Sequence, residues 1–404
     1  MYHFEIGIKP SEHDAFIASH PLANLLQSSG WAKVKGNWGS EIVGVYHDDS
    51  LVASAQLLIR KLPLGMTMIY ISRGPLMDYS NEPLVKIMLK GLRFFGASQR
   101  ALFVKMDPTI KYRAFQPGEE ATILGDAPKT IHRLQRAGLK WQGLTGKMVD
   151  TVQPRFQANV YRENFGEDKL SKKTRQMLRT ARKKEIEIQK GGMEFIPQFA
   201  EIMKKTEKRQ GIALRNADYY KKLLQTYPDS SFIMLAKLNL RKLHGDTTQR
   251  YKEEEREFQK LKENQVKKKH QLKEVRDSLI RELSELNEKI KKSGEEVIIA
   301  GTLTIVFART SEILYAGMDE DYKRYMPAYL TWFDSIQEAF AMGVQTCNLG
   351  GLESNLNNGL LQFKRHFNPT IEEFIGEFDL PVNRFLFTLS QCVYKLKKYR
   401  KKKV

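Results

Sequence analysis

The sequence predicts an α/β protein made of two similar halves, with a long charged helical hairpin inserted into the second half. Three observations lead to this fold class. Short apolar segments alternate with amphipathic ones in the first part of the chain. The same order returns in the second part, and a polar segment almost free of glycine and proline separates two of its strands.

In the first half, the apolar segments EIVGVYH (41–47) and LVASAQLLIRKL (51–62) predict a β-hairpin. A further strand is expected at MIYISRGP (68–75). The amphipathic segment EPLVKIMLKGLRFFGAS (82–98) predicts a helix, and ALFVKMDP (101–108) predicts the strand that follows it.

The second half repeats this order. The segments SFIMLAKL (231–238), IIAGTLTIVFAR (298–309) and EILYAGM (312–318) predict strands, and PAYLTWFDSIQEAFAMG (327–343) predicts a helix. The repetition favours two α/β units of one kind.

The segment from Arg241 to Lys292 is rich in Lys, Glu, Gln and Arg and predicts long helices. Apolar residues recur in it at alternating steps of three and four, the pattern of a coiled coil: Leu272, Val275, Leu279, Leu283, Leu286 and Ile290. We expect an antiparallel hairpin whose tip lies in the polar stretch 264–270. A solvated spacer, a tRNA contact and a subunit contact all remain open as its role.

These patterns divide the chain into four parts. The first α/β unit is expected at residues 1–150, and the second at 151–240 and 297–380. The helical arm takes 241–296, and a basic amphipathic segment takes 381–404.

The chain has 404 residues, 41% of them hydrophobic, and 66 Lys and Arg against 47 Asp and Glu, a formal net charge of +19. Its surface should attract polyanions such as nucleic acid, anionic lipid or pyrophosphate groups. The N-terminus lacks the pattern of a secretory signal, and no apolar run reaches about 18 residues. We therefore expect a cytosolic protein, free or peripheral to the membrane.

Known mechanistic motifs are mainly absent. The sequence has no Walker A motif, Rossmann glycine fingerprint, nucleophile elbow or zincin motif, which argues against ATPases, dehydrogenases, hydrolases and metalloproteases. Two cysteines, Cys347 and Cys392, are too few for a zinc site or a disulfide framework, so we expect two reduced thiols and no metal.

Two segments are strongly basic. KLSKKTRQMLRTARKK (169–184) has no acidic residue and predicts a helix that contacts nucleic-acid phosphates, with an ordinary solvated helix face as the alternative. The residues that would make these phosphate contacts are Lys172, Lys173, Arg175, Arg179 and Arg182. At the C-terminus, apolar FLFTLSQCVYKL precedes KKYRKKKV, a combination that suits an anionic membrane surface; a disordered tail or a frayed packed helix would explain it as well.

Several separated segments resemble the Fem family of peptidoglycan bridge-forming aminoacyltransferases, and most closely its streptococcal MurM-like branch. In chain order they are LQSSGWAKVKGNW, IYISRGPLMDY, VKMDP, LSKKTRQMLRTARKK, KTEKRQGIALRNADYY, LYAGMDEDYKRYMPAYLTW, CNLGG and GLLQFKRHFNPTIEEFIGEFDLP. The resemblance implies two acetyltransferase-like (GNAT-like) domains that use no coenzyme A or other cofactor. It also implies transfer of an amino acid, serine or alanine, from aminoacyl-tRNA to a stem-peptide amine of the lipid-linked peptidoglycan precursor.

The resemblance also assigns roles to residues. Lys364, in QFKRHFNP, matches a lysine placed near the reacting carbonyl, where a positive donor stabilises the oxyanion. Lys35 and Arg215 match positions that contact the precursor's phosphates or carboxylates. Without the resemblance, Lys364 would be interpreted as a surface lysine in a loop.

Four more residues are candidates on weaker grounds. Tyr219 lies one helical turn after Arg215, where it would hydrogen-bond the same ligand. Trp38 is expected to pack on the apolar or sugar portion of the precursor and Tyr315 to line the cleft, although isolated aromatic residues more often belong to the core. Asp107 ends a strand where a carboxylate can accept the amine's proton, but Pro108 after it makes a turn-forming role equally credible.

Two rival functions fit part of the sequence. A non-catalytic nucleic-acid-binding coiled-coil protein would explain the charge and the helical arm. A coenzyme-A-dependent acyltransferase would share the fold, but it would need a glycine-rich pyrophosphate loop, for which QRAGLKWQG is a poor candidate.

Overall fold

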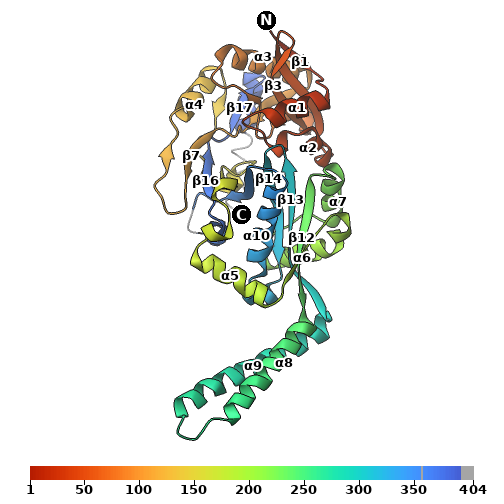
Figure 1. Ribbon diagram of the computed structural model, residues 1–404. Helices are drawn as coiled ribbons and strands as arrows, with labels where there is room; N and C mark the ends of the chain where they lie inside the picture. Colours follow the sequence, from red (N-terminus) through yellow and green to blue (C-terminus); the bar gives the residue numbers. More distant parts are fainter. Residues whose placement is uncertain (356–357, 393–404) are drawn as a thin grey trace.

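The computed structural model describes residues 1–355 and 358–392. In this part of the chain, two mixed β-sheets form the body, one at the top of Figure 1 and one below it, and a pair of long helices projects from the lower end. The α/β fold class and the presence of two sheet units are confirmed.

The first sheet contains the predicted hairpin and the strands that follow it. Its strands in spatial order are β1 (Tyr2–Ile6), β2 (Gly39–His47), β3 (Ser50–Lys61), β4 (Thr67–Ile71), β6 (Ala101–Met106), β17 (Phe378–Pro381) and β9 (Lys140–Trp141), and β5 (Leu76–Met77) pairs with β3. Helix α3 (Glu82–Ser98) connects β4 to β6, which runs parallel to β4. Leu84, Met88 and Leu92 recur every four residues on its buried face, as the amphipathic pattern predicts.

The second sheet repeats this connection. Its strands in spatial order are β11 (Glu187–Gly191), β12 (Ser231–Asn239), β13 (Glu296–Phe307), β14 (Thr310–Met318), β15 (Thr346–Leu352), β10 (Phe156–Tyr161), β16 (Thr370–Phe374), β7 (Lys111–Phe115) and β8 (Thr122–Ile123). Strands β12, β13 and β14 form an antiparallel meander, and helix α10 (Pro327–Ala341) then leads to β15, which runs parallel to β14.

The two units are tied together by exchanged strands. Strand β7 follows the first unit's β6 in the chain but pairs with β16 in the second sheet. Strand β17 lies near the end of the chain but pairs with β6 in the first sheet. The domain boundaries at residues 150 and 380 stay a prediction. Strands β7 and β17 nevertheless each pair in the sheet of the other predicted unit.

The remaining helices cover the sheets and the junction between them. They are α1 (Pro10–Ser19), α2 (Ser29–Val34), α4 (Ala127–Arg136), α5 (Lys172–Lys183), α6 (Ile196–Gln210), α7 (Ala217–Thr226) and α11 (Gly359–Lys364). One apolar cluster crosses the junction, because Trp31 and Val34 of α2 pack with Tyr220 and Leu223 of α7. The two units therefore share part of their core, which fixes the relative position of groups at the junction.

The arm consists of α8 (Leu240–Gln259) and α9 (Val266–Ser293), which pack against each other along their length. Leu279 and Leu286, two of the six residues that predict the coiled coil, are buried, and the other four are partly buried. The chain reverses at 260–265, slightly earlier than predicted, because Val266 to His270 already form the first turns of α9. Supercoiling of the two helices stays a prediction.

Within the described residues, no helix is long and apolar enough to cross a membrane, and no group of three or more His, Cys, Asp or Glu side chains could hold a metal ion. Cys347 is buried and Cys392 is exposed, and both are free thiols. The basic residues of KKYRKKKV (397–404) lie outside the described residues.

Candidate functional site

Lys35 and Arg215 meet where helix α2 of the first unit packs against helix α7 of the second. Lys35 follows the last residue of α2, and Arg215 lies two residues before α7. A side chain at Gly30 would come within 3.0 Å of Tyr227, so glycine permits the close approach of the two helices. The guanidinium of Arg215 lowers the pKa of Lys35 in addition to the larger effect of burial, so the two cations are near each other.

Three of the predicted aromatic residues surround this pair of cations. The guanidinium of Arg215 stacks over the ring of Tyr219, 4.9 Å from its centroid, and donates a hydrogen bond to the hydroxyl of Tyr315. The hydroxyl of Tyr219 also donates to Tyr315. Trp38 lies nearby at the edge of the same apolar cluster, under the guanidinium of Arg60 at 5.7 Å. Together they form an aromatic wall with positive charge at its rim, suited to an anionic ligand with an apolar portion.

A β-bulge in strand β14 places the side chains of Glu312 and Tyr315 on one face of the second sheet. Tyr315 pairs with Leu303 and Ile313 pairs with Thr304, so Leu314 is an extra residue in the strand. Ile313 points into the core beneath α10. Glu312 lines the cavity beside the sheet, and without the extra residue it would lie on the face opposite to Tyr315.

Lys364 is a buried lysine, only 3% exposed, at the end of α11. Its ammonium donates a hydrogen bond of 2.9 Å to the carbonyl oxygen of Gly351. Burial lowers the pKa of Lys364 to about 7, and the carboxylate of Glu312 opposes this shift. Gly350 has φ +88°, and a Cβ atom added there would lie 3.5 Å from the Lys364 ammonium. Glycine in the CNLGG segment therefore permits the backbone turn beside the lysine.

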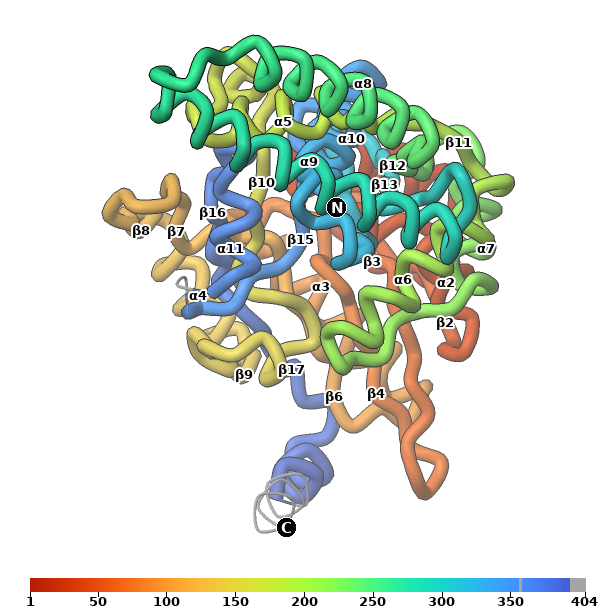
Figure 2. Tube along the Cα trace, turned by 90° about the horizontal axis from the view of Figure 1, so that it is seen from below, coloured from red at the N-terminus to blue at the C-terminus, as the bar shows by residue number. Residues whose placement is uncertain are grey.

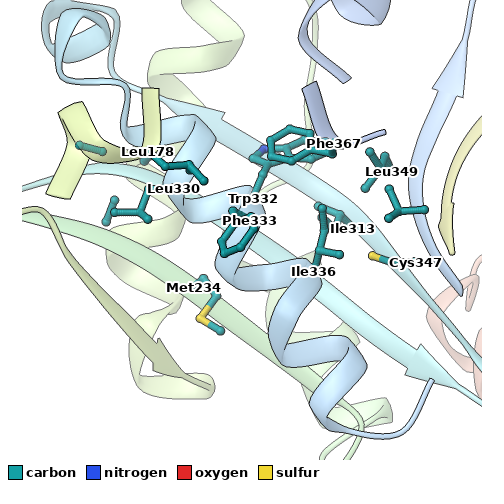
Figure 3. Packing of buried hydrophobic residues seen from close by; sticks show 14 of the residues in the cluster. Leu178, Met234, Ile313, Leu330, Trp332, Phe333, Ile336, Cys347, Leu349 and Phe367 are labelled. Atoms are coloured by element: carbon teal, nitrogen blue, oxygen red, sulfur yellow. The ribbon is translucent and has the colours of Figure 1, made fainter. Parts of the chain in front are cut away.

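The segment on either side of Lys364 is held by aromatic packing. Phe367 stacks on Trp332 of α10 with ring centroids 6.0 Å apart, as Figure 3 shows, and Phe363 meets the same indole edge-on at 5.2 Å. The lysine therefore projects from a rigid support, which a group that stabilises a transition state requires.

Asp107 is buried, and its carboxylate already accepts hydrogen bonds from neighbouring residues. Its Oδ1 accepts hydrogen bonds from the Arg73 backbone N–H at 2.8 Å and from the Tyr70 hydroxyl at 3.0 Å, and its Oδ2 lies 3.5 Å from the Arg73 guanidinium. Burial raises the pKa of Asp107 to about 6. The guanidinium of Arg73 also donates to the carbonyl of Pro154, so Asp107 contributes to positioning a buried arginine between the two units.

A polar cavity of about 270 Å³ lies at the junction, beside β14. Residues 21–25 and Thr109 line it from the first unit, and strands β10, β14, β15 and β16 line it from the second. Glu372 on its wall is saturated by an ion pair with Lys111 (2.6 Å) and by hydrogen bonds from Asn159 (2.8 Å) and Tyr161. Glu312 on the opposite side has no such partner among the described residues.

Comparison with known proteins decides the family. The family model described as "FemAB family" matches residues 8–395. The chain belongs to the FemAB family. Its relatives include the lipid II:glycine glycyltransferase of Staphylococcus haemolyticus, 28% identical over 411 residues that cover 96% of this chain and 95% of the relative. The enzyme of the same name from Staphylococcus aureus strain USA300 is 27% identical over 413 residues.

A solved structure has the same fold. The crystal structure of FemX superposes with a TM-score of 0.76 over 95% of this chain and 99% of that chain, at 24% sequence identity. The predicted membership of the Fem family and the two-unit α/β fold are thus confirmed, whereas the MurM-like branch stays a prediction.

In this FemAB chain, the basic segment forms helix α5, whose buried residues are Thr174, Leu178 and Ala181 and which packs on α10. Figure 3 shows Leu178 beside Leu330 of α10. Its outer face exposes Lys172, Lys173 and Arg179, which form no ion pair with any described residue. Two other candidates are already engaged. Arg182 pairs with Glu167 at 2.8 Å, and Arg175 donates to the carbonyl of Asp168.

The structure brings together most of the predicted site. Lys35, Trp38, Arg215, Tyr219 and Tyr315 form one cluster, and Glu312 connects it electrostatically to Lys364, because its charge acts on both Tyr315 and Lys364. Sequence reasoning missed Glu312 and Arg73. A glutamate within the otherwise apolar strand EILYAGM was the available signal for the first; nothing in the sequence marked Arg73 as buried.

Proposed function

We propose that this FemAB protein transfers an amino acid from aminoacyl-tRNA to a stem-peptide amine of the lipid-linked peptidoglycan precursor, lipid II, and so forms branched muropeptides. The observation that carries the proposal is the buried Lys364, which is held by its backbone acceptor and interacts electrostatically with Glu312 on the wall of the junction cavity. The staphylococcal relatives are named for transfer to lipid II, which supports the same acceptor here.

Lys364 is suited to stabilise the oxyanion that forms when the amine attacks the ester carbonyl. A charge held in a site that excludes water acts more strongly than one in solvent. With a pKa of about 7, its ammonium is also acidic enough to supply a proton to the departing ribose oxygen. The ester is already activated, which agrees with the absence of an ATP-binding motif.

Lys35 and Arg215 are proposed to bind the diphosphate or carboxylate groups of the precursor. A planar guanidinium forms paired hydrogen bonds with both kinds of group. The surrounding Trp38, Tyr219 and Tyr315 offer aromatic surface to the rest of the ligand. The mutual repulsion of the two cations would be relieved when an anion binds between them.

Helix α5 is proposed to bind the tRNA. The hydroxyl of Thr174 on this helix lies 2.8 Å from Nδ1 of His366, two residues after Lys364. Phosphates bound on the exposed face of α5 would therefore lie on the same side of the protein as the catalytic lysine. Lys172, Lys173 and Arg179 are the phosphate ligands that this arrangement favours.

Peripheral contact with the anionic inner face of the plasma membrane is also proposed. The described residues 384–392 are helical. In this C-terminal helix, Phe385 and Leu389 are 76% and 53% exposed, and Phe94 of α3 is 69% exposed. Arg384 acts electrostatically on Arg93, so the two basic residues are near each other beside these apolar groups. Figure 2 shows this helix leaving the body next to β17 and β6.

A direct assay can identify the amino acid that is transferred. Serine or alanine is what the MurM-like resemblance implies, whereas the staphylococcal relatives are named for glycine. Lipid II is incubated with the protein and with seryl-, alanyl- or glycyl-tRNA, each radiolabelled in the amino acid. We expect label on lipid II from serine or alanine. Transfer that requires acyl-coenzyme A, or a tRNA gel shift without loss of the ester, would contradict the proposed function.

A further inference from the structure

Glu312 is a carboxylate that the fold leaves without a partner at the junction cavity. In the described part of the chain, it accepts no hydrogen bond and forms no ion pair, and it is only partly exposed. Glu372, across the same cavity, is instead neutralised by Lys111 and hydrogen-bonded by Tyr161 and Asn159. Burial of a carboxylate without a partner costs free energy. We therefore expect a ligand to supply the hydrogen bonds and positive charge that Glu312 lacks.

The groups around Glu312 define the ligand's charge. Arg73 and Lys364 act on it electrostatically from two sides, while burial raises the pKa of its carboxyl. Neither cation is placed to satisfy it, because Arg73 is paired with Asp107 and the ammonium of Lys364 donates to Gly351. The cavity side remains open, and the side chains of Gln157 and Asn348 line it there. This environment suits a small cationic group with several hydrogen-bond donors.

We propose that Glu312 binds the ammonium group of the acceptor and takes its proton, so that the amine attacks the ester in its neutral form. This inference rests on the proposed function and adds a catalytic residue to it. The cavity beside Glu312 is then the subsite of the acceptor amine, and Lys364 stands on the side of the carbonyl oxygen.

The step balances in protons and bonds. The ammonium loses one proton to the carboxylate of Glu312, and the resulting amine forms a C–N bond with the ester carbonyl. The tetrahedral intermediate then loses a second proton from nitrogen, the C–O bond to the ribose breaks, and the ribose oxygen receives a proton from Lys364. The proton that leaves nitrogen in this second step recharges the Lys364 amine. Products are the amide and the free ribose hydroxyl, and one proton in total passes to solvent through Glu312.

The experiment separates proton removal from the rest of the reaction. A lipid II analogue carries an aminooxy group in place of the acceptor amine; this nitrogen is uncharged at neutral pH and needs no base before it attacks. Glu312→Gln should lower kcat with ordinary lipid II by about 100-fold or more, in the range of a lost general base. With the aminooxy analogue, the same variant should retain kcat within about 5-fold of the unmodified protein, since no proton transfer to the carboxylate is needed first.

Matched variants guard against a merely structural effect. Glu312→Asp keeps a carboxylate and should retain part of the activity with lipid II, and Glu201→Gln, which changes an exposed glutamate on α6, should change neither reaction. A Glu312→Gln protein with unchanged kcat on lipid II would overturn the inference, as would equal losses with both acceptors at an unchanged melting temperature. If the unmodified protein transfers to neither acceptor, the proposed function fails first, and the role of Glu312 fails with it.

Discussion

Replacing Lys364 by methionine should slow transfer by at least about 100-fold and at the same time stabilise the folded protein near neutral pH. The reason is that Lys364 is buried at 3% exposure, and burial lowers its pKa from 10.5 to about 7. In the unfolded chain the same lysine would keep its ordinary pKa. Methionine has a similar length and no charge, so it fills the site without the unfavourable desolvation.

The size of the effect follows from the pKa. At about 1.36 kcal/mol per pH unit, a charged Lys364 destabilises the fold by about 5 kcal/mol below pH 7. Its hydrogen bond to the Gly351 carbonyl offsets about 1 kcal/mol of this. We therefore expect Lys364→Met to raise the free energy of unfolding by about 3 to 4 kcal/mol at pH 6.

The sign of the pH dependence is distinctive. Between about pH 7 and pH 10.5 the unfolded lysine binds a proton that the folded one has released, so the unmodified protein becomes more stable as the pH rises. The advantage of Lys364→Met should therefore shrink to within about 1 kcal/mol at pH 9.5. Urea unfolding of both proteins at pH 6 and pH 9.5 measures this difference.

Lys90→Met is the matched control, because Lys90 lies on the exposed face of α3. It should shift the free energy of unfolding equally at the two pH values and leave transfer intact. The reasoning would be refuted if Lys364→Met were no more stable than the unmodified protein at pH 6, or if the difference between them did not change with pH.

Three further outcomes are expected from variants of the proposed substrate contacts and of the buried ion pair. Changing Lys172, Lys173 and Arg179 to Gln should raise the KM for charged tRNA and reduce the salt slope of log KM by about 2 to 3, at about 0.7 to 0.9 per phosphate contact; an unchanged slope would reject α5 as the tRNA site. Arg215→Ala should raise the KM for lipid II by about 10- to 100-fold, as expected for a lost charge-assisted hydrogen bond, and kinetics in lipid II that stay the same would remove this residue from the precursor site. Asp107→Asn removes the carboxylate that pairs with the buried Arg73 and should destabilise the fold by about 3 to 5 kcal/mol in urea unfolding, whereas a fully stable variant with lost kcat would support Asp107 as the base.

The hydrophobic periodicity of the sequence was sufficient to predict helices and strands in both units. The four-residue recurrence of Leu84, Met88 and Leu92 predicts α3, and the apolar run at 298–309 predicts β13, because burial of one helix face or of a whole strand leaves a pattern in the chain. The arm was predictable for the same reason, since Leu279 and Leu286 alternate with charged residues that face solvent.

The exchange of β7 and β17 between the sheets was not predictable from these patterns. Each of these short strands pairs with a segment more than 200 residues away, and alternation along a strand does not reveal its partner. The orientation of Glu312 depends on the single extra residue Leu314 in β14, which leaves no signal in the hydrophobic pattern.

The proximity of Lys35 and Arg215 could not be predicted from hydrophobic periodicity either, for a different reason. It depends on the close packing of α2 against α7, which Gly30 permits, and so on the tertiary contact between the two units. Resemblance to the Fem family supplied both residues, and the structure supplied their proximity.

Lys364 is proposed to act in the transfer of an aminoacyl group from tRNA to lipid II. The most direct test is a single-turnover reaction with excess protein, labelled aminoacyl-tRNA and lipid II, in which the aminoacylated lipid II is followed by mass spectrometry. The unmodified protein should form this product without coenzyme A, and Lys364→Met should form it at least about 100-fold more slowly, as for a lost oxyanion donor. Transfer by Lys364→Met at the rate of the unmodified protein would contradict the account.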